Sequence, residues 1–175
     1  MPTELTLDES DVLAWVNEYT QPTKPIKDEE LSQILHFSLI WNLFERNACC
    51  KEANPVNIRK AVEKASGVGK LSSATFNVYL NYFQSRSQRD GMSINGYLDA
   101  LKIKNIDRNH VLNVLNGNLV DVNNVVLALL LIANRIRNNL FHGEKDLAEL
   151  YTQSELFRVI NSLLINYLNC TKDVT

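Results

Sequence analysis

The sequence has few of the residues that mark β-rich proteins. Its 175 residues include six glycines and four prolines, and three of the prolines precede residue 26. Alternating runs of Val, Ile and Thr, which are typical of strands, are scarce. Because so few turn residues interrupt the chain, we expect an all-α fold in a single domain spanning residues 1–175.

Cysteines and long apolar runs are also few. Three cysteines, of which Cys49 and Cys50 are adjacent, suit neither a disulfide framework nor a zinc site, so we expect reduced thiols. The longest apolar run is too short to span a bilayer, and the acidic residues 1–10 do not resemble a secretory signal. We therefore expect a cytoplasmic protein with no membrane contact, no metal and no cofactor.

Negative charge slightly exceeds positive charge overall, but not in the middle of the chain. The formal net charge is −2, which is not that of a strongly basic nucleic-acid-binding protein. Residues 51–110 nevertheless hold ten Lys and Arg against five Asp and Glu. Arg86 and Arg89 follow aromatic residues there and are candidate RNA contacts, because aromatic rings stack on bases and arginines bind phosphates. A core stripe with a basic exposed end is the competing interpretation.

Capping residues and apolar periodicity predict a series of helices. The expected helices cover residues 8–20, 28–50, 55–66, 73–88, two short segments within 93–116, 121–143 and 148–169. The expected N-caps are Asn54, Ser72 or Ser73, Asp107 and Asp121. The long helices predict a four-helix bundle, with residues 51–117 as a small, basic helical insert.

Two of these helices are expected to lie at the centre. The helix over residues 28–50 has an aromatic stripe and a second stripe of Leu35, Leu39 and Leu43, which predicts a wide buried face. Residues 125–133 carry no polar side chain, which predicts burial on nearly all sides. We expect a symmetric partner to help cover this segment, in a homodimer whose central helices meet near residues 130–142.

The polar end of the central helix carries the sequence RNNLFH at residues 137–142. It resembles the signature of the HEPN superfamily, an arginine followed after four residues by a histidine. The surrounding sequence and the aromatic helix over residues 28–50 are similar to one prokaryotic branch of that superfamily. The resemblance implies a dimeric, HEPN-like helical bundle. Many such domains are metal-independent endoribonucleases of toxin-antitoxin, CRISPR-linked and phage-defence systems.

The resemblance also implies roles for individual residues. Arg137, Asn138 and His142 are the expected catalytic residues. Supporting roles are expected for Arg135, Asn134, Glu45 and Asn42. Glu144 stands where HEPN toxins silenced by adenylylation carry a tyrosine, so control of that kind is not expected.

The expected chemistry needs few groups, because RNA supplies its own nucleophile, the 2′-hydroxyl. His142 titrates near neutral pH and can move a proton, and an arginine can stabilise the charge that builds on the phosphate. Helical spacing places Arg135 nearly in line with His142, whereas the HEPN resemblance selects Arg137. We take Arg137 as the catalytic cation and Arg135 as a supporting one.

Two functions therefore remain open. The first is a metal-independent endoribonuclease of a toxin-antitoxin or anti-phage defence system, with RNA as substrate and an antitoxin or defence-system protein as partner. The second is a non-catalytic HEPN-like module that binds a nucleotide, an RNA or a protein. The pair of Arg137 and His142 favours the first function. The acidic isoelectric point of about 5.9 favours the second.

Overall fold

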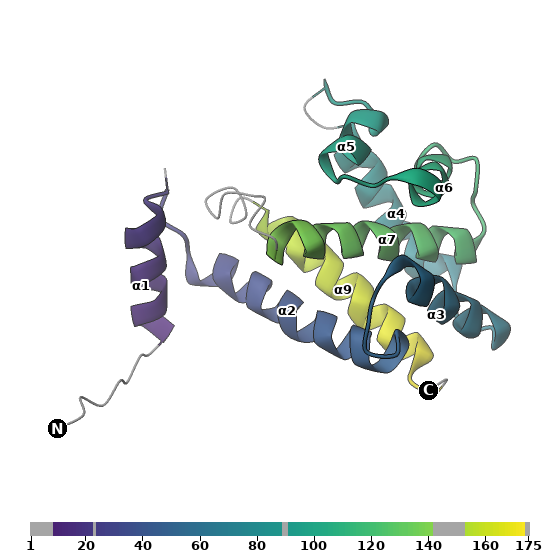
Figure 1. Cartoon of the computed structure of the whole chain (residues 1–175), viewed down its shortest axis with the longest axis horizontal. Helices are drawn as coiled ribbons and strands as arrows, with labels where there is room; N and C mark the ends of the chain where they lie inside the picture. The colour runs from purple at the N-terminus through teal and green to yellow at the C-terminus, as the bar shows by residue number, and fades with distance from the viewer. Residues whose placement is uncertain (1–8, 23, 89–90, 142–152, 174–175) are drawn as a thin grey trace.

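The computed structural model describes residues 9–22, 24–88, 91–141 and 153–173, and these residues form helices joined by short links. The helices are α1 (Glu9–Thr20), α2 (Asp28–Ala48), α3 (Pro55–Gly67), α4 (Ser73–Ser87), α5 (Ile94–Ala100), α6 (Asn105–Leu115), α7 (Val122–Phe141) and α9 (Ser154–Thr171) (Figure 1). The described part of the chain contains no strand, which confirms the all-α class.

Two helix starts follow the predicted capping residues, and a third helix ends just before a glycine. The Asn54 side chain accepts a hydrogen bond from the Asn57 amide at 2.9 Å, just before the proline that opens α3. Asp121 caps α7 in the same way, accepting from the Asn124 amide at 3.1 Å. Gly117 follows α6 with φ of 77°, the left-handed conformation that ends helices. These ends are set by local sequence.

Three other ends differ from the prediction. Helix α6 begins at Asn105, so Asp107 lies in its first turn and is not its cap. The Asp107 carboxylate instead pairs with Arg59 at 2.5 Å. Ser72 occupies the N-cap position of α4 but makes no side-chain capping bond. Helix α9 begins at Ser154, later than expected, and residues 148–152 lie outside the described residues.

Helix α7 forms the centre of the molecule. Every residue from Val125 to Ala133 is at most 9% exposed, which confirms burial on all sides. The helices that cover it are α3, α4 and α6 of the same chain (Figure 1). A partner is therefore not needed to cover this segment, and that reason for a homodimer was wrong. The wider hydrophobic core comes from many sequence-distant helices, each burying one face.

Helix α2 packs mainly against α9. Its aromatic stripe is buried, and Phe37 and Phe44 contact the rings of Phe157 and Tyr167 with centroids 5.5 and 5.7 Å apart. The second stripe is not buried, because Leu35, Leu39 and Leu43 are 54%, 67% and 50% exposed. The prediction of a wide buried face was wrong for these leucines, since among the described helices α9 alone packs extensively against α2.

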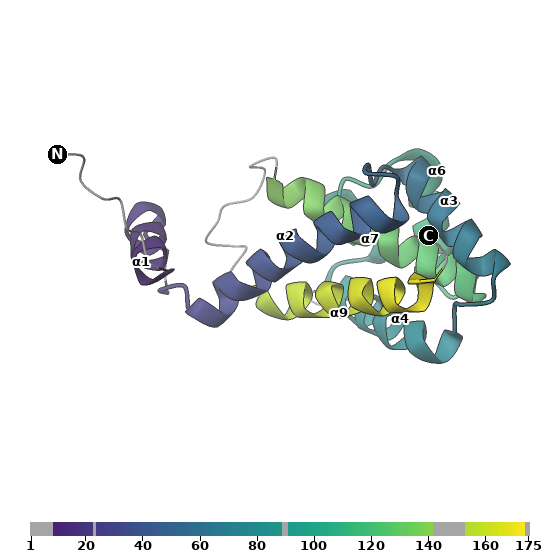
Figure 2. The ribbon, with the colours of Figure 1, turned by 90° about the horizontal axis from the view of Figure 1, so that it is seen from below.

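Helix α1 lies apart from the other helices in both views (Figure 1 and Figure 2). The Asn17 side chain binds the link between α1 and α2. It donates a hydrogen bond to the Ile26 backbone carbonyl at 3.1 Å and accepts one from the Ile26 backbone amide at 2.7 Å. Trp15 and Tyr19 stack with centroids 5.1 Å apart and remain 60% and 74% exposed. The apolar face of α1 is thus largely uncovered by the described residues.

No helix in the described ranges is both long and apolar enough to cross a membrane.

Candidate functional site at the end of the central helix

The C-terminal half of α7 borders a cavity of about 510 Å³. Leu131, Asn134, Arg135 and Asn138 fall on one face of the helix, because residues three and four apart are neighbours there, and all four line the cavity. The opposite wall is the link from α5 to α6, with Lys102 and Lys104. We call this space the basic cavity, since its lining includes three cations.

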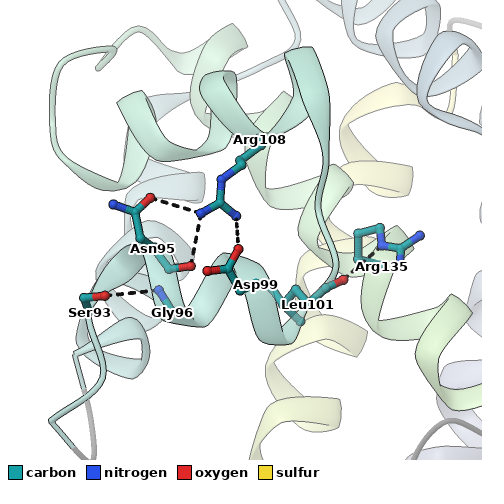
Figure 3. A network of polar contacts seen from close by, with 7 residues as sticks. All are labelled: Ser93, Asn95, Gly96, Asp99, Leu101, Arg108 and Arg135. Carbon is teal, nitrogen blue, oxygen red and sulfur yellow. Dashed lines mark hydrogen bonds and ion pairs between the residues drawn. The ribbon is translucent and has the colours of Figure 1, made fainter.

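Arg135 holds the far wall of the cavity against α7. Its Nε donates a hydrogen bond to the Leu101 carbonyl at 3.0 Å (Figure 3). Leu101 is the C-cap of α5, where helix carbonyls lack partners within the helix. Arg135 therefore has a structural contact as well as a place in the lining. Helical spacing places Arg135 nearly in line with His142. In the structure Arg135 both contacts the Leu101 carbonyl and lines the cavity.

A second set of contacts fixes the same wall from the other side. On α6, Arg108 pairs with Asp99 of α5 at 2.8 Å and donates to the Asn95 side chain at 3.1 Å (Figure 3). The Ser93 hydroxyl accepts from the Gly96 amide at 3.1 Å and caps the short helix α5. The link between α5 and α6 is consequently anchored at both ends.

Arg137 and Asn138 are brought together directly. The Arg137 Nη1 donates to the Asn138 side-chain oxygen at 3.3 Å, and both side chains are half-buried. Asn138 thus touches Arg137 and also lines the basic cavity. His142, the third expected catalytic residue, lies outside the described residues. In the sequence it follows directly after Phe141, the last residue of α7.

Asn134 is the most buried polar residue of this region, with 4% exposure. No hydrogen bond joins its side-chain amide to another described residue. An amide at the wall of a cavity that makes no hydrogen bond to the protein is free to bond water or a ligand. Asn134 faces the basic cavity, because it is one of its lining residues.

Glu45 and Asn42 lie on α2, whose main partner is α9 and not α7. Asn42 is exposed. The Glu45 backbone carbonyl accepts hydrogen bonds from the amides of Cys49 and Lys51 at 3.3 and 2.8 Å, where α2 ends. Neither residue lines the basic cavity. Their supporting role at His142 stays a prediction, since His142 is not described.

Of the two predicted RNA contacts at the end of α4, Arg86 makes contacts with other side chains of the fold. The Arg86 Nη1 donates to the Tyr82 hydroxyl at 3.4 Å. Burial raises the pKa of the Tyr97 phenol above its ordinary value, and the adjacent Arg86 guanidinium opposes that rise. Phe76 and Phe83 of the same helix are fully buried, so these aromatic rings belong to the core. Arg89 lies outside the described residues.

Sequence reasoning did not single out Lys102, Lys104 or Asn105, which all line the basic cavity. The excess of positive charge in residues 51–110 was the signal that pointed to this part of the chain. His110 lies within the fold, where its Nε2 donates to the Asn124 carbonyl at 3.1 Å.

Within the described ranges, no three His, Cys, Asp or Glu side chains are grouped so that they could hold a metal ion. The three cysteines are free thiols, and Cys49 is buried. A comparison with known proteins adds no assignment, because no family model, no curated protein and no solved structure matches this chain.

Proposed function

We propose that this chain is a metal-independent endoribonuclease of HEPN type, acting on RNA in a toxin-antitoxin or anti-phage defence system. The observation that carries the proposal is the contact between Arg137 and Asn138, which lie one turn before His142 in the sequence. Residues 137–141 of the sequence that resembles the HEPN signature thus form the last turn of α7, where the Arg137 and Asn138 side chains are in contact.

The mechanism needs one proton carrier and one fixed cation. Neutral His142 takes the proton of a ribose 2′-hydroxyl, whose oxygen attacks the adjacent phosphorus and forms a 2′,3′-cyclic phosphate. The bond from phosphorus to the 5′-oxygen breaks, and the departing oxygen receives a proton from the histidine or from water. Arg137 neutralises the charge on the phosphate oxygens as the transition state forms. Asn138 orients Arg137 through the hydrogen bond between them.

A homodimer is part of this proposal, and its interface is assigned to the exposed face of α2 and α9. This face carries Leu35, Leu39 and Leu43 of α2 and Ile165 of α9, which is 43% exposed. Helix α1 carries a second uncovered apolar face, with Trp15 and Tyr19. In a two-fold dimer each copy can cover the apolar face of the other, because the same pair of surfaces meets twice.

The proposal is tested by incubating purified protein with total RNA and tRNA in the presence of EDTA. Cleavage should persist, and the new ends should carry a 2′,3′-cyclic phosphate or a 3′-phosphate on one fragment and a 5′-hydroxyl on the other. Cleavage that stops when divalent ions are removed, or that leaves 5′-phosphates, would contradict the proposed chemistry.

The basic cavity favours a second candidate function, a non-catalytic module that binds a nucleotide or an RNA. Its described lining combines three cations with the side-chain amides of Asn134 and Asn138. If the wild-type protein and the His142→Ala variant are equally unable to cleave RNA, and equally harmless when expressed, this second function is favoured.

A further inference from the structure

We propose that the basic cavity is a phosphate-binding site, built to hold the phosphate group of an RNA strand or of a free nucleotide. The site shares Asn138 with the proposed cleavage chemistry, and Arg137 is not among its described lining residues. Where the proposed ribonuclease function holds, this site grips a phosphate near the one that is cleaved.

The charges of the lining favour an anion. Lys102 and Lys104 from the α5–α6 link and Arg135 from α7 border the cavity. Among the described lining residues, Asp107 is the one carboxylate, and its pairing with Arg59 at 2.5 Å offsets its negative charge. Lys104 and Arg135 give this partly enclosed space a positive charge, which attracts a phosphate more strongly than an open surface does.

Helix α6 adds a second attraction. It has eleven residues, and its N-cap Lys104 and first-turn residues Asn105 and Asp107 border the cavity. The N-cap residue Lys104 supplies no side-chain hydrogen bond to the first amides of the helix. Uncapped amides and the positive end of the helix dipole form a ready site for phosphate oxygens.

The side chain of Asn134 is a further observation that indicates a ligand site, independent of the charges. Its side chain is 4% exposed, borders the cavity, and makes no hydrogen bond to a described residue. A cavity-facing amide can donate two hydrogen bonds to phosphate oxygens. Asn138, four residues later on the same face, adds a second amide that also contacts Arg137.

The walls are fixed before any ligand arrives. Arg135 ties Leu101 to α7 at 3.0 Å, and Arg108 ties α6 to Asp99 at 2.8 Å (Figure 3). A site held in this way loses little conformational freedom when it binds. Its volume of about 510 Å³ lies within the range of small-ligand sites, so a mononucleotide or one nucleotide of a strand can enter.

The test measures binding without cleavage. Calorimetric titration with inorganic phosphate, with adenosine 5′-monophosphate and with a 2′-O-methyl RNA pentamer covers the sources of phosphate, and the pentamer cannot react because its 2′-oxygen is blocked. The proteins are wild type, Lys104→Ala, Asn134→Ala and the control Lys60→Ala. Lys60 is exposed on α3 and does not line the cavity.

We expect Lys104→Ala and Asn134→Ala each to weaken binding about tenfold, which corresponds to one charged hydrogen bond, and Lys60→Ala to leave it unchanged. If Asn134→Ala fails to fold, Lys104→Ala decides, because Lys104 is exposed. Tighter binding of the mononucleotide identifies a nucleotide site, and tighter binding of the pentamer identifies a strand site.

No binding of any probe at low salt, or an equal loss in Lys60→Ala and Lys104→Ala, overturns the phosphate site. The His142→Ala variant separates this proposal from the proposed function, because it should bind the pentamer normally. Cleavage that depends on His142 without any binding in the cavity would overturn the phosphate site alone.

Discussion

At the scale of single residues, Arg135 and Arg137 show how one helix separates two tasks. The side chains are two positions apart, so they point to different sides of α7. Arg135 reaches Leu101, which is 34 positions earlier in the chain, whereas Arg137 contacts its neighbour Asn138. The first contact joins two parts of the fold, and the second organises the end of one helix.

Replacement of Arg135 should therefore lower the stability of the protein. In Arg135→Ala the Leu101 carbonyl loses a charged donor, and we expect the free energy of unfolding to fall by roughly 1 to 3 kcal/mol. The control is Arg158→Ala, which removes an exposed ion pair with Glu29 and should cost less than about 1 kcal/mol. Urea denaturation of both variants measures the difference. Equal losses would show that the contact with Leu101 adds nothing.

The adjacent cysteines should differ in reactivity. Burial, with the neighbouring Glu45 and Cys50, raises the pKa of Cys49 to about 12, so at pH 8 it is a neutral thiol and a poor nucleophile. Cys50 is exposed. We expect iodoacetamide at pH 8 to modify Cys50 in the native protein and Cys49 only after unfolding, as read by peptide mass spectrometry. Modification of both at equal rates in the native protein would contradict the burial of Cys49.

At the scale of helices, local sequence predicted most starts and stops but not what covers each face. Caps such as Asn54 and Asp121 act within one turn, so they can be recognised without the rest of the fold. The leucine stripe of α2 was assigned to the core because periodicity shows which residues share a face. Periodicity does not show whether a partner helix lies against that face.

The exposed stripe of α2 leads to a prediction about assembly. We expect wild-type protein to have about twice the chain mass of 19.9 kDa by light scattering at micromolar concentration. Leu39→Glu should reduce it to the monomer, because two charges would be buried in the interface. Its stability as a monomer should change little, since Leu39 is 67% exposed.

Val78→Glu is the matched control for this experiment. Val78 is 61% exposed on α4 and outside the α2–α9 face, so its replacement should leave the mass unchanged. A monomeric wild-type protein would rule out the dimer. A dimer that survives Leu39→Glu would place the interface elsewhere.

At the scale of the whole molecule, one part of the candidate site could be predicted from the sequence and the other part could not. The sequence of residues 137–142 is continuous, so its resemblance to HEPN could be read directly. The basic cavity combines residues near positions 55, 102–107 and 131–138. Its formation depends on long-range contacts such as those between Arg135 and Leu101 and between Arg59 and Asp107. No local sequence pattern predicts these long-range contacts. The positive charge of residues 51–110 was the one sequence feature that pointed to this region.

The central claim, that His142 and Arg137 cleave RNA, is tested most directly by comparing single-turnover cleavage rates of one RNA in EDTA. His142→Ala should be slower than wild type by at least about a hundredfold, as expected when a proton carrier is removed, and Arg137→Ala by a comparable factor. Arg135→Ala should lose less, and Lys60→Ala should match wild type. If His142→Ala cleaves as fast as wild type, or if Arg135→Ala is inactive while Arg137→Ala is active, the account of this site is wrong.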